Sequence, residues 1–373
     1  MSTITPEKTA AESAVFPVAG ILAVDDNNAY VRVSGYAPGP DDVQVPLAMV
    51  RKYRLRAGDD VLGTARLPRN GGTRNGRSRP VLVTAPTMPD RPAFNDLTPV
   101  NPHERLTLGP DPVGRIIDLV TPIGKGQRGL VVAPPKAGKT MILQSLARSI
   151  AANHPECHLM LLLIDERPEE VTDLRKSVPG AEVVWSTFDR PPGEHIAVAD
   201  LAVERAKRLA EQGRDVVILL DSLTRLGRAH NLAAPGSSRI LAGGVAASAL
   251  YPPKKFFGAA RNLEEAGSLT IIATALVETG SRMDEVFFEE FKGTGNMELR
   301  LSRKLAERRL FPAIDLAASS TRRDELIVPA DELARTWRLR SMLAALDDTQ
   351  ALELLLAKVK ETRTNTAFLA ELP

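Results

Sequence analysis

The stretch GLVVAPPKAGKTMILQSLARSI, residues 129–150, decides the fold of this chain. An apolar run is followed by a short loop and then by apolar residues at helical spacing, which predicts a strand, a turn and a helix. The loop ends in Gly138-Lys139-Thr140, as phosphate-binding loops do. Ala133 stands where the strict pattern has glycine, so the alternative is an ordinary strand–turn–helix with a fortuitous Gly-Lys-Thr.

A phosphate-binding loop in this context implies ATP and Mg²⁺ as cofactors. Backbone N–H groups at the start of the helix would surround the phosphates. Lys139 would reach the β- and γ-phosphates, and Thr140 would hold the metal. The other loop residues expected against the nucleotide are Pro135, Lys136, Ala137 and Gly138.

The sequence on either side of this loop alternates between apolar strand-like runs and amphipathic helical runs from about residue 113. HLMLLLID, AEVVWSTF, DVVILLD and SLTIIATAL predict strands, whereas EEVTDLRKSV and HIAVADLAVERAKRLAEQG predict helices. Apolar strands without alternation, separated by helices, are typical of a parallel sheet with helical crossovers. LARTWRLRSMLAALDD and ALELLLAKVKE predict terminal helices. Together these patterns predict an α/β nucleotide-binding domain over 113–373.

The N-terminal part has a different texture. Residues 1–14 are small and polar and are expected to be disordered. GILAV, AYVRV, DVQVPLAMV, DDVLGTARL and the run Val81–Ala85 predict five short strands, which suit an OB-fold barrel over 15–85. The stretch 66–80 has five arginines and no acid and is expected to be an exposed loop, and the proline-rich stretch 86–112 is expected to be a linker.

Composition restricts the class of protein. The formal net charge is only +2, so a nucleic-acid site must be a local basic patch. The single cysteine excludes a disulfide within the chain, and the histidines match no zinc pattern. With no secretory signal and no apolar stretch of the ~20 residues that a membrane helix needs, we expect a cytoplasmic protein without a membrane contact.

Acidic and basic partners for the nucleotide are sought at strand ends. Asp221 closes DVVILLD and would support the metal, or alternatively cap the following helix. Hydrolysis needs a group that activates or orients water; Glu166 is chosen, although position alone does not separate it from Asp165, Glu169 and Glu170. AERRLFPAID and STRRDE contain candidate arginines for transition-state charge, and composition selects none of them.

Aromatic and basic residues of the barrel are candidates for RNA binding. Tyr30 and Arg32 share one face of an alternating strand, and Tyr36 and the segment RKYR at 51–54 are close in sequence. Aromatic rings flanked by cations on a small barrel form a stacking platform for single strands. The alternative, which stands equally, is a core tyrosine with solvated arginines.

Longer stretches of the sequence closely resemble the transcription termination factor Rho family. They are GQRGLVVAPPKAGKT, LIDERPEEVTDL, ILLDSLTRLGRAHN, FFGAARNLEEAGSLTIIATALVETGS, DEVFFEEFKGTGNMEL and LSRKLAERRLFPAIDL. GPDDVQV and RKYRLRAGD carry the resemblance into the barrel, so that it runs from about Gly20 to the C-terminus. It implies a RecA-like ATPase with a cold-shock-like OB barrel, a homohexameric ring that binds ATP between subunits, transport of single-stranded RNA, and dissociation of the RNA polymerase complex.

The resemblance also implies residue roles. Glu166 matches the catalytic glutamate, Arg322 the arginine finger, Arg309 a second catalytic arginine and Arg167 the arginine beside the glutamate. Met141 and Phe311 match residues that pack on adenine. The matches to the two RNA loops of the central channel are Arg239, Ile240 and Leu241, and Thr279, Gly280 and Arg282; Arg225 and Arg228 match the arginines of the network that couples RNA to ATP.

Departures from the family pattern concern RNA. Rho sequences generally carry alanine at the position of Ala133, but many have lysine where Arg239 and Arg282 stand. Asn28 stands where an aromatic residue is expected, which could remove about 1–3 kcal/mol of base stacking. Only about 14 residues precede the barrel, so the small helical module usual in the family is expected to be absent or vestigial.

Three functions therefore remain to be compared. The first is the full enzyme, an RNA-stimulated ATPase and helicase that terminates transcription. The second is a Rho-like regulator that binds RNA or a transcription complex with weak ATPase, suggested by Asn28 and the short N-terminus; Glu166, Arg309 and Arg322 argue against it. The third is a rotary ATPase subunit, which the arginines of the channel loops disfavour.

Overall fold

The computed structural model describes residues 15–25, 27–67, 79–85 and 87–372, and it divides into two units, Met1–Asp90 and Arg91–Pro373. The expected arm at 1–14 and most of the arginine-rich stretch at 66–80 lie outside the described residues.

The first unit is a closed barrel with the strand order β1-β2-β3-β5-β4. Only the β3–β5 pair is parallel, and all other strand pairs of the barrel are antiparallel. Alternate apolar residues such as Leu22, Val31 and Val61 fill its core. The predicted five-stranded barrel is confirmed. Its elements are β1 (Val15–Val24), β2 (Ala29–Arg32), β3 (Val43–Gln44), α1 (Leu47–Lys52), β4 (Asp60–Arg66) and β5 (Val81–Thr84).

One strand of the barrel differs from its prediction. DVQVPLAMV was expected to be extended throughout, but the strand stops at Gln44 and helix α1 follows from Leu47. Pro46 causes the change: its φ of −60° suits the residue just before a helix, and its ring removes the N–H that a ladder would need.

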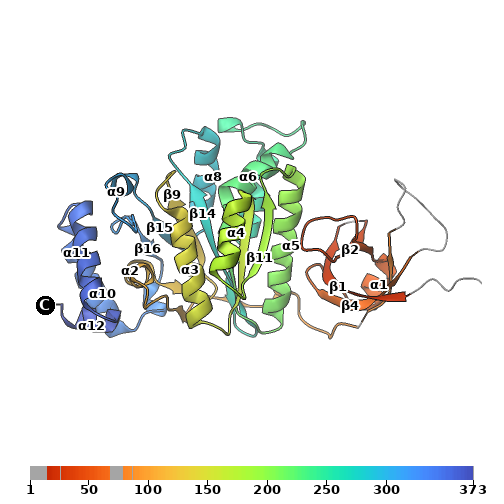
Figure 1. Cartoon of the computed structure of the whole chain (residues 1–373), viewed down its shortest axis with the longest axis horizontal. Helices are drawn as coiled ribbons and strands as arrows, with labels where there is room; N and C mark the ends of the chain where they lie inside the picture. Colours follow the sequence, from red (N-terminus) through yellow and green to blue (C-terminus); the bar gives the residue numbers. More distant parts are fainter. Residues whose placement is uncertain (1–14, 26, 68–78, 86, 373) are drawn as a thin grey trace, which may run out of the picture. The chain divides into compact units, whose positions relative to one another are not determined.

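The second unit is built on a nine-stranded sheet (Figure 1). Its main order is β11-β10-β12-β14-β9-β15-β16, and β13 and β6 extend it from β14. The five strands from β11 to β9 pair in parallel, as the alternating pattern predicted. These strands are β9 (Arg128–Ala133), β10 (His158–Glu166), β11 (Glu182–Thr187), β12 (Val216–Asp221), β13 (Arg261–Leu263), β14 (Ser268–Leu276), β15 (Met297–Arg300) and β16 (Ser320–Thr321).

Both faces of this sheet are buried. Leu159, Leu161 and Leu163 of β10 belong to one core cluster with apolar residues of α3 and α4. The alternate residues Met160 and Leu162 are equally buried but lie outside that cluster, on the face contacted by α5. A parallel strand covered on two sides must be apolar at every position, which explains the unalternating runs. The helices are α3 (Lys139–Asn153), α4 (Pro168–Ser177) and α5 (Pro192–Glu211).

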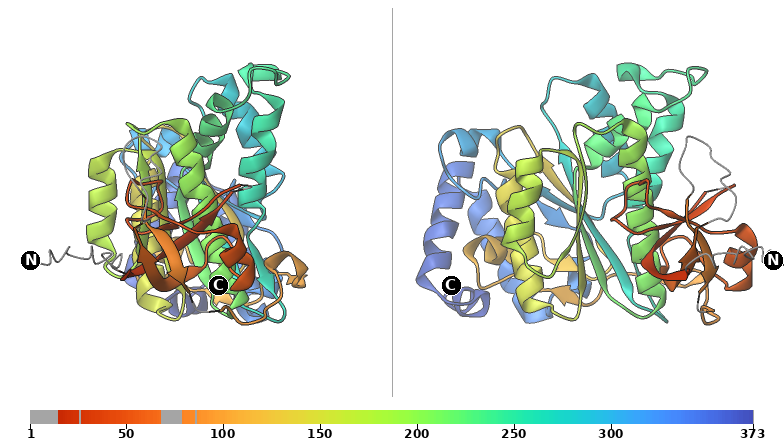
Figure 2. Two further views of the ribbon diagram at one scale, coloured as in Figure 1. Left: turned by 90° about the vertical axis from the view of Figure 1, so that its right-hand side faces the viewer. Right: turned by 45° about the vertical axis from the view of Figure 1, so that its right-hand side comes forward.

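Two further groups of helices lie around the sheet, one at the carboxyl ends of the strands and one beyond the edge strand β16. The segment from α6 to α8, green to cyan in Figure 2, lies at the carboxyl end of the strands. The C-terminal helices lie beyond β16 and contact α2 (Figure 1). These elements are α2 (Pro112–Val120), α6 (Leu223–Leu232), η2 (Ala242–Gly244), α7 (Ala247–Phe257), α8 (Arg282–Lys292), α9 (Arg303–Glu307), η3 (Asp324–Leu326), α10 (Ala330–Ala344), α11 (Asp348–Glu361) and α12 (Asn365–Ala370).

Most of the stretch expected to be a linker belongs to the second unit instead. The units divide after Asp90, and Phe94 of η1 (Phe94–Asp96) is only 1% exposed. Its amide N–H donates to Glu211 Oε1 at 2.7 Å. Short strands β6 (Pro99–Val100) and β7 (Arg105–Leu106) pair with β13 and with β8 (Ile123–Gly124). Proline-rich composition alone does not reveal this, because the partners are distant in sequence.

Candidate nucleotide and RNA sites

The loop between β9 and α3 has the backbone geometry of an anion-binding site. Lys136 and Gly138 both have positive φ, 65° and 93°, and the helix begins directly at Lys139. Successive amides in such turns point their N–H groups into one concavity, at the positive end of the helix dipole. The loop is therefore shaped to hold a phosphate, as the sequence predicts.

Two carboxylates meet the lysine of this loop. β10 and β12 are neighbours, with Leu163 opposite Asp221, so the end of each strand places a carboxylate at the same edge. Lys139 Nζ donates to Glu166 Oε1 at 2.9 Å and to Asp221 Oδ1 at 2.5 Å. Thr274 of β14 adds a hydrogen bond to Asp221 Oδ1 at 2.8 Å. Sequence reasoning missed Thr274; a polar residue inside the apolar run SLTIIATAL was the available signal.

Burial shapes the electrostatics of this cluster. Glu166 and Asp221 are 2% and 1% exposed. Burial raises the pKa of Glu166, the charge of Asp221 adds to the rise, and Lys139 and Arg225 oppose it. Burial acts to lower the pKa of Lys139, but the two carboxylates outweigh it and the pKa is raised. Lys139 therefore stays protonated, and Glu166 binds a proton more tightly than an exposed glutamate does.

A cavity of 370 Å³ opens beside these groups. Glu166 Oε2 is buried and has no hydrogen-bond partner among the described residues, so this oxygen remains available to a ligand or water. Thr140 Oγ1 lies 3.5 Å from Glu170 Oε2. The residues lining the cavity are Lys136, Gly138, Lys139, Thr140, Met141, Glu166, Arg167, Glu170 and Arg225.

Two apolar side chains flank the loop. A Cβ atom on Gly138 would lie 3.4 Å from both Met141 and the ring of Phe311, so these residues meet at the glycine. Phe311 is 37% exposed, which leaves ring surface open to a flat ligand. The structure therefore brings Met141 and Phe311 together beside the phosphate loop.

The three predicted catalytic arginines, Arg167, Arg309 and Arg322, and the predicted coupling arginine Arg225 lie at different positions relative to the cavity. Arg167 is at the rim, with its side chain 66% exposed and 3.9 Å from Glu170. Arg225 lies inside, with one guanidinium nitrogen 3.3 Å from Glu166 Oε1 and the other 3.6 Å from Asp165 Oδ2. Arg309 and Arg322 are exposed and are not among the residues lining the cavity of their own chain.

The two predicted channel loops touch. Arg239, Ile240 and Leu241 precede η2, and Thr279 and Gly280 precede α8, which begins at Arg282. A Cβ on Gly243 would lie 2.7 Å from the carbonyl oxygen of Arg282, so the loops pack backbone to backbone. Asn231 joins them: its amide donates to the Gly244 carbonyl oxygen at 3.2 Å and lies 3.8 Å from Met283 Sδ. Arg239, Arg282 and the 63% exposed Ile240 face outward.

The second loop is also tied to α6. Arg228 Nε donates to Asp284 Oδ1 at 2.8 Å, and Thr279 Oγ1 donates to Asp284 Oδ2 at 2.6 Å. Asp284 is only 1% exposed. Arg225 and Arg228 are three residues apart on one helix, so α6 connects the nucleotide cavity to the channel loop. Sequence reasoning did not single out Asp284 or Asn231.

The barrel presents Tyr30 between two cations. The guanidinium carbons of Arg32 and Arg79 lie 5.6 and 5.2 Å from the ring centroid. Arg32 is also held in an ion pair with Asp42. Tyr36, by contrast, is only 8% exposed, so its ring is not offered as a stacking surface.

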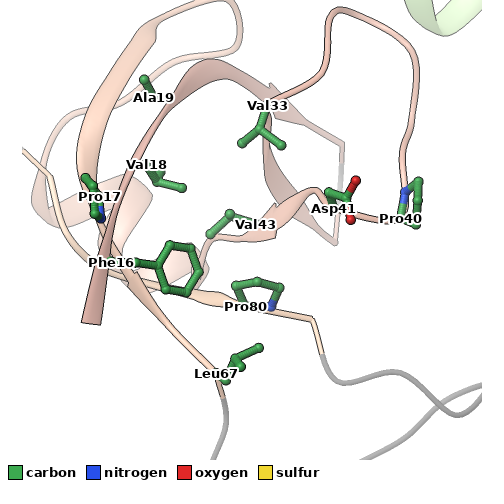
Figure 3. Close-up of a pocket in the computed structure, with 10 residues that line it drawn as sticks. All are labelled: Phe16, Pro17, Val18, Ala19, Val33, Pro40, Asp41, Val43, Leu67 and Pro80. Carbon is green, nitrogen blue, oxygen red and sulfur yellow. The ribbon is translucent and has the colours of Figure 1, made fainter. Parts of the chain in front are cut away.

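A separate cavity of 660 Å³ opens on the barrel (Figure 3). Its walls are apolar apart from Asp41, and neither Tyr30 nor Arg32 lines it. The lining residues are Phe16, Pro17, Val18, Ala19, Val33, Pro40, Asp41, Val43, Leu67 and Pro80. The aromatic platform and the cavity are therefore different places on the barrel.

Two general features complete the description. Among the described residues, no group of three or more histidine, cysteine and acidic side chains could hold a metal ion on its own. Within the same part of the chain, none of the helices combines the length and apolarity that crossing a bilayer requires.

Comparisons with known proteins divide the chain in the same way. Residues 18–80 match the Rho termination factor RNA-binding domain, and residues 114–321 match the nucleotide-binding domain of the ATP synthase alpha/beta family. Among solved structures, an ATPase from a bacterial type III secretion system is similar with a TM-score of 0.62 and 22% identity, over 79% of this chain and 93% of that one. At that identity the likeness shows the fold alone.

Curated relatives are much more similar in sequence. Transcription termination factor Rho of Streptomyces lividans is 60% identical over 97% of this chain and 52% of that protein. The Micrococcus luteus protein of the same name is 62% identical over 95% of this chain and 53% of that protein. The chain thus spans about half the length of these two relatives. For the Streptosporangium roseum protein of the same name, identity is 59% over 95% of this chain and 91% of that protein.

Proposed function

This chain belongs to the transcription termination factor Rho family, and from that membership we propose that it is an ATP-driven RNA translocase and helicase that terminates transcription. It binds nascent single-stranded RNA in the cytoplasm and acts on RNA polymerase complexes. The relatives at 59–62% identity carry the name Rho, and the N-terminal domain matches a Rho RNA-binding domain, which disfavours a rotary ATPase subunit.

The observation that carries the proposal is the contact of Lys139 with both Glu166 and Asp221, beside a cavity that Lys139 and Glu166 line. Lys139 binds the β- and γ-phosphates. Glu166 orients the attacking water and takes its proton, and a raised pKa suits a carboxylate for that task at neutral pH. Pro135, Lys136, Ala137 and Gly138 surround the phosphates, and Met141 and Phe311 pack on the adenine.

Mg²⁺ would be held by Thr140 and Asp221. A hydroxyl at the start of α3 and a buried carboxylate at a strand end are oxygen donors of the kind that Mg²⁺ takes in nucleotide sites. Bound Mg²⁺ would neutralise charge on the phosphate oxygens. Asp221 also orients Lys139, and Thr274 fixes Asp221.

The chain acts as a homohexameric ring, as the family resemblance implies, and the position of Arg322 supports a contact between copies. Arg322 lies outside the cavity that holds Glu166, so it completes a site only when a second copy presents it. A contact that joins two different faces of identical chains closes into a ring when its rotation allows. Arg322 is then the arginine finger and Arg309 the second catalytic arginine, and Arg167 lies at the rim of the site.

RNA binds at two places in this proposal. Tyr30 and Arg32 form the primary site on the barrel, where cations beside an aromatic ring suit a single strand. Arg239, Ile240, Leu241, Thr279, Gly280 and Arg282 form the channel site. Arg225 and Arg228 link that site to ATP, because one contacts Glu166 and the other contacts Asp284 below the second loop.

The test is ATP hydrolysis by the purified chain without RNA and with poly(C), poly(U) or poly(A). Strong stimulation by poly(C) is the expected result. Equal stimulation by all three would support the RNA-stimulated ATPase but indicate that the barrel binds RNA through charge, without selecting bases. Such binding falls steeply with salt. RNA binding without stimulation would replace the proposal with a Rho-like regulator that binds RNA or a transcription complex.

A further inference from the structure

A buried histidine lies behind the nucleotide cavity in a place that the proposed mechanism does not use. His195, in the first turns of α5, is 5% exposed. Its Nδ1 shares a hydrogen bond of 2.8 Å with the hydroxyl of Ser186, a β11 residue that is itself 2% exposed. Its Nε2 faces Asp165 Oδ1 at 4.0 Å, a distance for electrostatic contact rather than a direct hydrogen bond.

Asp165 has an unusual backbone. Its φ is 57°, and the register of β10 against β11 shifts between Ile164 and Glu166, which marks a bulge at Asp165. In a regular strand the side chains of residues 165 and 166 would point to opposite faces. Here Asp165 and Glu166 both approach the guanidinium of Arg225, at 3.6 and 3.3 Å. The bulge therefore re-aims one side chain so that both carboxylates share a cation.

A left-handed conformation at a non-glycine residue costs about 1–3 kcal/mol and persists only where the surroundings enforce it. The contacts that surround Asp165 are Arg225 on one side and His195 on the other. Burial lowers the pKa of His195, which favours the neutral ring. If Ser186 donates to Nδ1, the single ring proton sits on Nε2 and points at Asp165.

We propose that His195 is a positioning residue for ATP hydrolysis: it holds Asp165, which holds Arg225, which sets the position of Glu166 opposite Lys139. This inference rests on the proposed ATPase function. It gives α5 a part in catalysis, although His195 itself touches neither nucleotide nor the reacting atoms.

Two amide variants separate this role from simple packing. The His195→Asn amide takes the place of Nδ1 and keeps the bond to Ser186, but it is too short to reach Asp165. The His195→Gln amide takes the place of Nε2 and reaches Asp165. We expect His195→Asn to lower kcat for RNA-stimulated hydrolysis on the order of tenfold, with KM for ATP unchanged, and His195→Gln to restore most of kcat.

A double-mutant cycle tests the path. Asp165→Asn should lower kcat as His195→Asn does, and the double variant should be no slower than Asp165→Asn alone, because both changes break one chain of contacts. Asp165 is 34% exposed, so this variant also tests the path if the buried substitution hinders folding.

Several results would overturn the inference: wild-type kcat in either His195→Asn or Asp165→Asn, equal loss in the Asn and Gln variants, or additive losses in the cycle. The wild-type chain is measured in the same assay. If it shows no RNA-stimulated hydrolysis, the proposed function fails; if it is active and the variants match it, only the role of His195 fails.

Discussion

At the scale of single residues, the two oxygens of the Glu166 carboxylate have different surroundings. Oε1 accepts from Lys139 and faces Arg225, whereas Oε2 is buried without a hydrogen-bond partner among the described residues. A buried acceptor without a partner costs about 1–3 kcal/mol. Such a cost is typical of groups kept for chemistry, because a water held at Oε2 is oriented and can give up its proton there.

Replacing Glu166 with Gln should therefore leave ATP binding intact and lower kcat by about a hundredfold or more, because an amide cannot take the proton. The measurement is nucleotide affinity and RNA-stimulated turnover in the same preparation. Glu169→Gln, at an exposed carboxylate three residues away, is the matched control and should keep wild-type turnover. Normal turnover in Glu166→Gln would remove this residue from catalysis.

The candidate residues differ in how far the sequence could identify them. The spacing of Gly138-Lys139-Thr140 after an apolar run was enough to predict a strand, a loop and a helix, because such a loop is a local structure. The choice among Asp165, Glu166, Glu169 and Glu170 was not local. The family resemblance selects Glu166, and in the structure burial and the approach of Lys139 from a different element distinguish it; spacing alone shows neither.

At the scale of elements, the two proposed channel loops should act as one unit, because their backbones touch. Gly243 has φ 72°, and a Cβ there would meet the Arg282 carbonyl oxygen at 2.7 Å. Gly243→Ala should push the second loop away and reduce RNA stimulation of turnover on the order of tenfold, while hydrolysis without RNA persists. The measurement is ATPase rate against RNA concentration.

Gly244 provides the control for that variant. Its φ of 75° carries the same backbone strain, but a Cβ there would meet no described residue within 4 Å. If Gly244→Ala loses RNA stimulation as fully as Gly243→Ala does, strain alone is responsible and loop contact is not.

Asp118 of helix α2 is buried, and ionisation of its carboxyl group destabilises the folded chain. Burial raises the pKa of Asp118 to about 6, against an ordinary value of 3.8, although Arg105 and the N–H groups of Leu108 and Gly109 oppose the rise. The folded chain therefore binds this proton more tightly than the unfolded chain. Its contribution to stability is complete below pH 3.8 and is lost as the pH rises through about 6.

Between pH 4 and pH 7 the unfolding free energy of the wild type should fall, relative to Asp118→Asn, on the order of 2 kcal/mol. Thermal unfolding of both proteins across that range measures it. Parallel curves of Tm against pH would show that Asp118 keeps an ordinary pKa in the folded chain.

Elements were predictable where periodicity and local signals agreed. The helix over residues 139–153 and the strands around HLMLLLID and DVVILLD stand where the apolar pattern places them, because parallel strands buried on two faces leave a strong signal. The prediction of an extended strand over the whole of DVQVPLAMV was wrong, because Pro46 interrupts the strand and a helix follows it. The proline-rich composition after Asp90 did not reveal the structure of that stretch, because Phe94 and β6 contact residues of α5 and β13 that are more than a hundred positions away.

At the scale of the whole molecule, the proposed hydrolytic site needs two copies of the chain, because Arg322 does not line the cavity that Glu166 lines. Glu166 and Arg322 lie near opposite edges of the sheet. Glu166 ends β10, the neighbour of the edge strand β11, whereas Arg322 directly follows β16, the strand at the other edge. The two residues can meet only if one copy presents the β16 edge to the cavity of the next.

Two inactive variants should therefore rescue each other. Arg322→Ala keeps Glu166, and Glu166→Gln keeps Arg322, so in rings assembled from an equal mixture about a quarter of the contacts between copies combine an intact glutamate with an intact arginine. Activity should appear on mixing, in proportion to such contacts, after subunits are separated and reassembled. A chain carrying both substitutions, reassembled with itself, should stay inactive. Failure of the mixture to hydrolyse ATP, when labelled subunits show that mixed rings have formed, would mean that Arg322 does not act on a neighbouring copy.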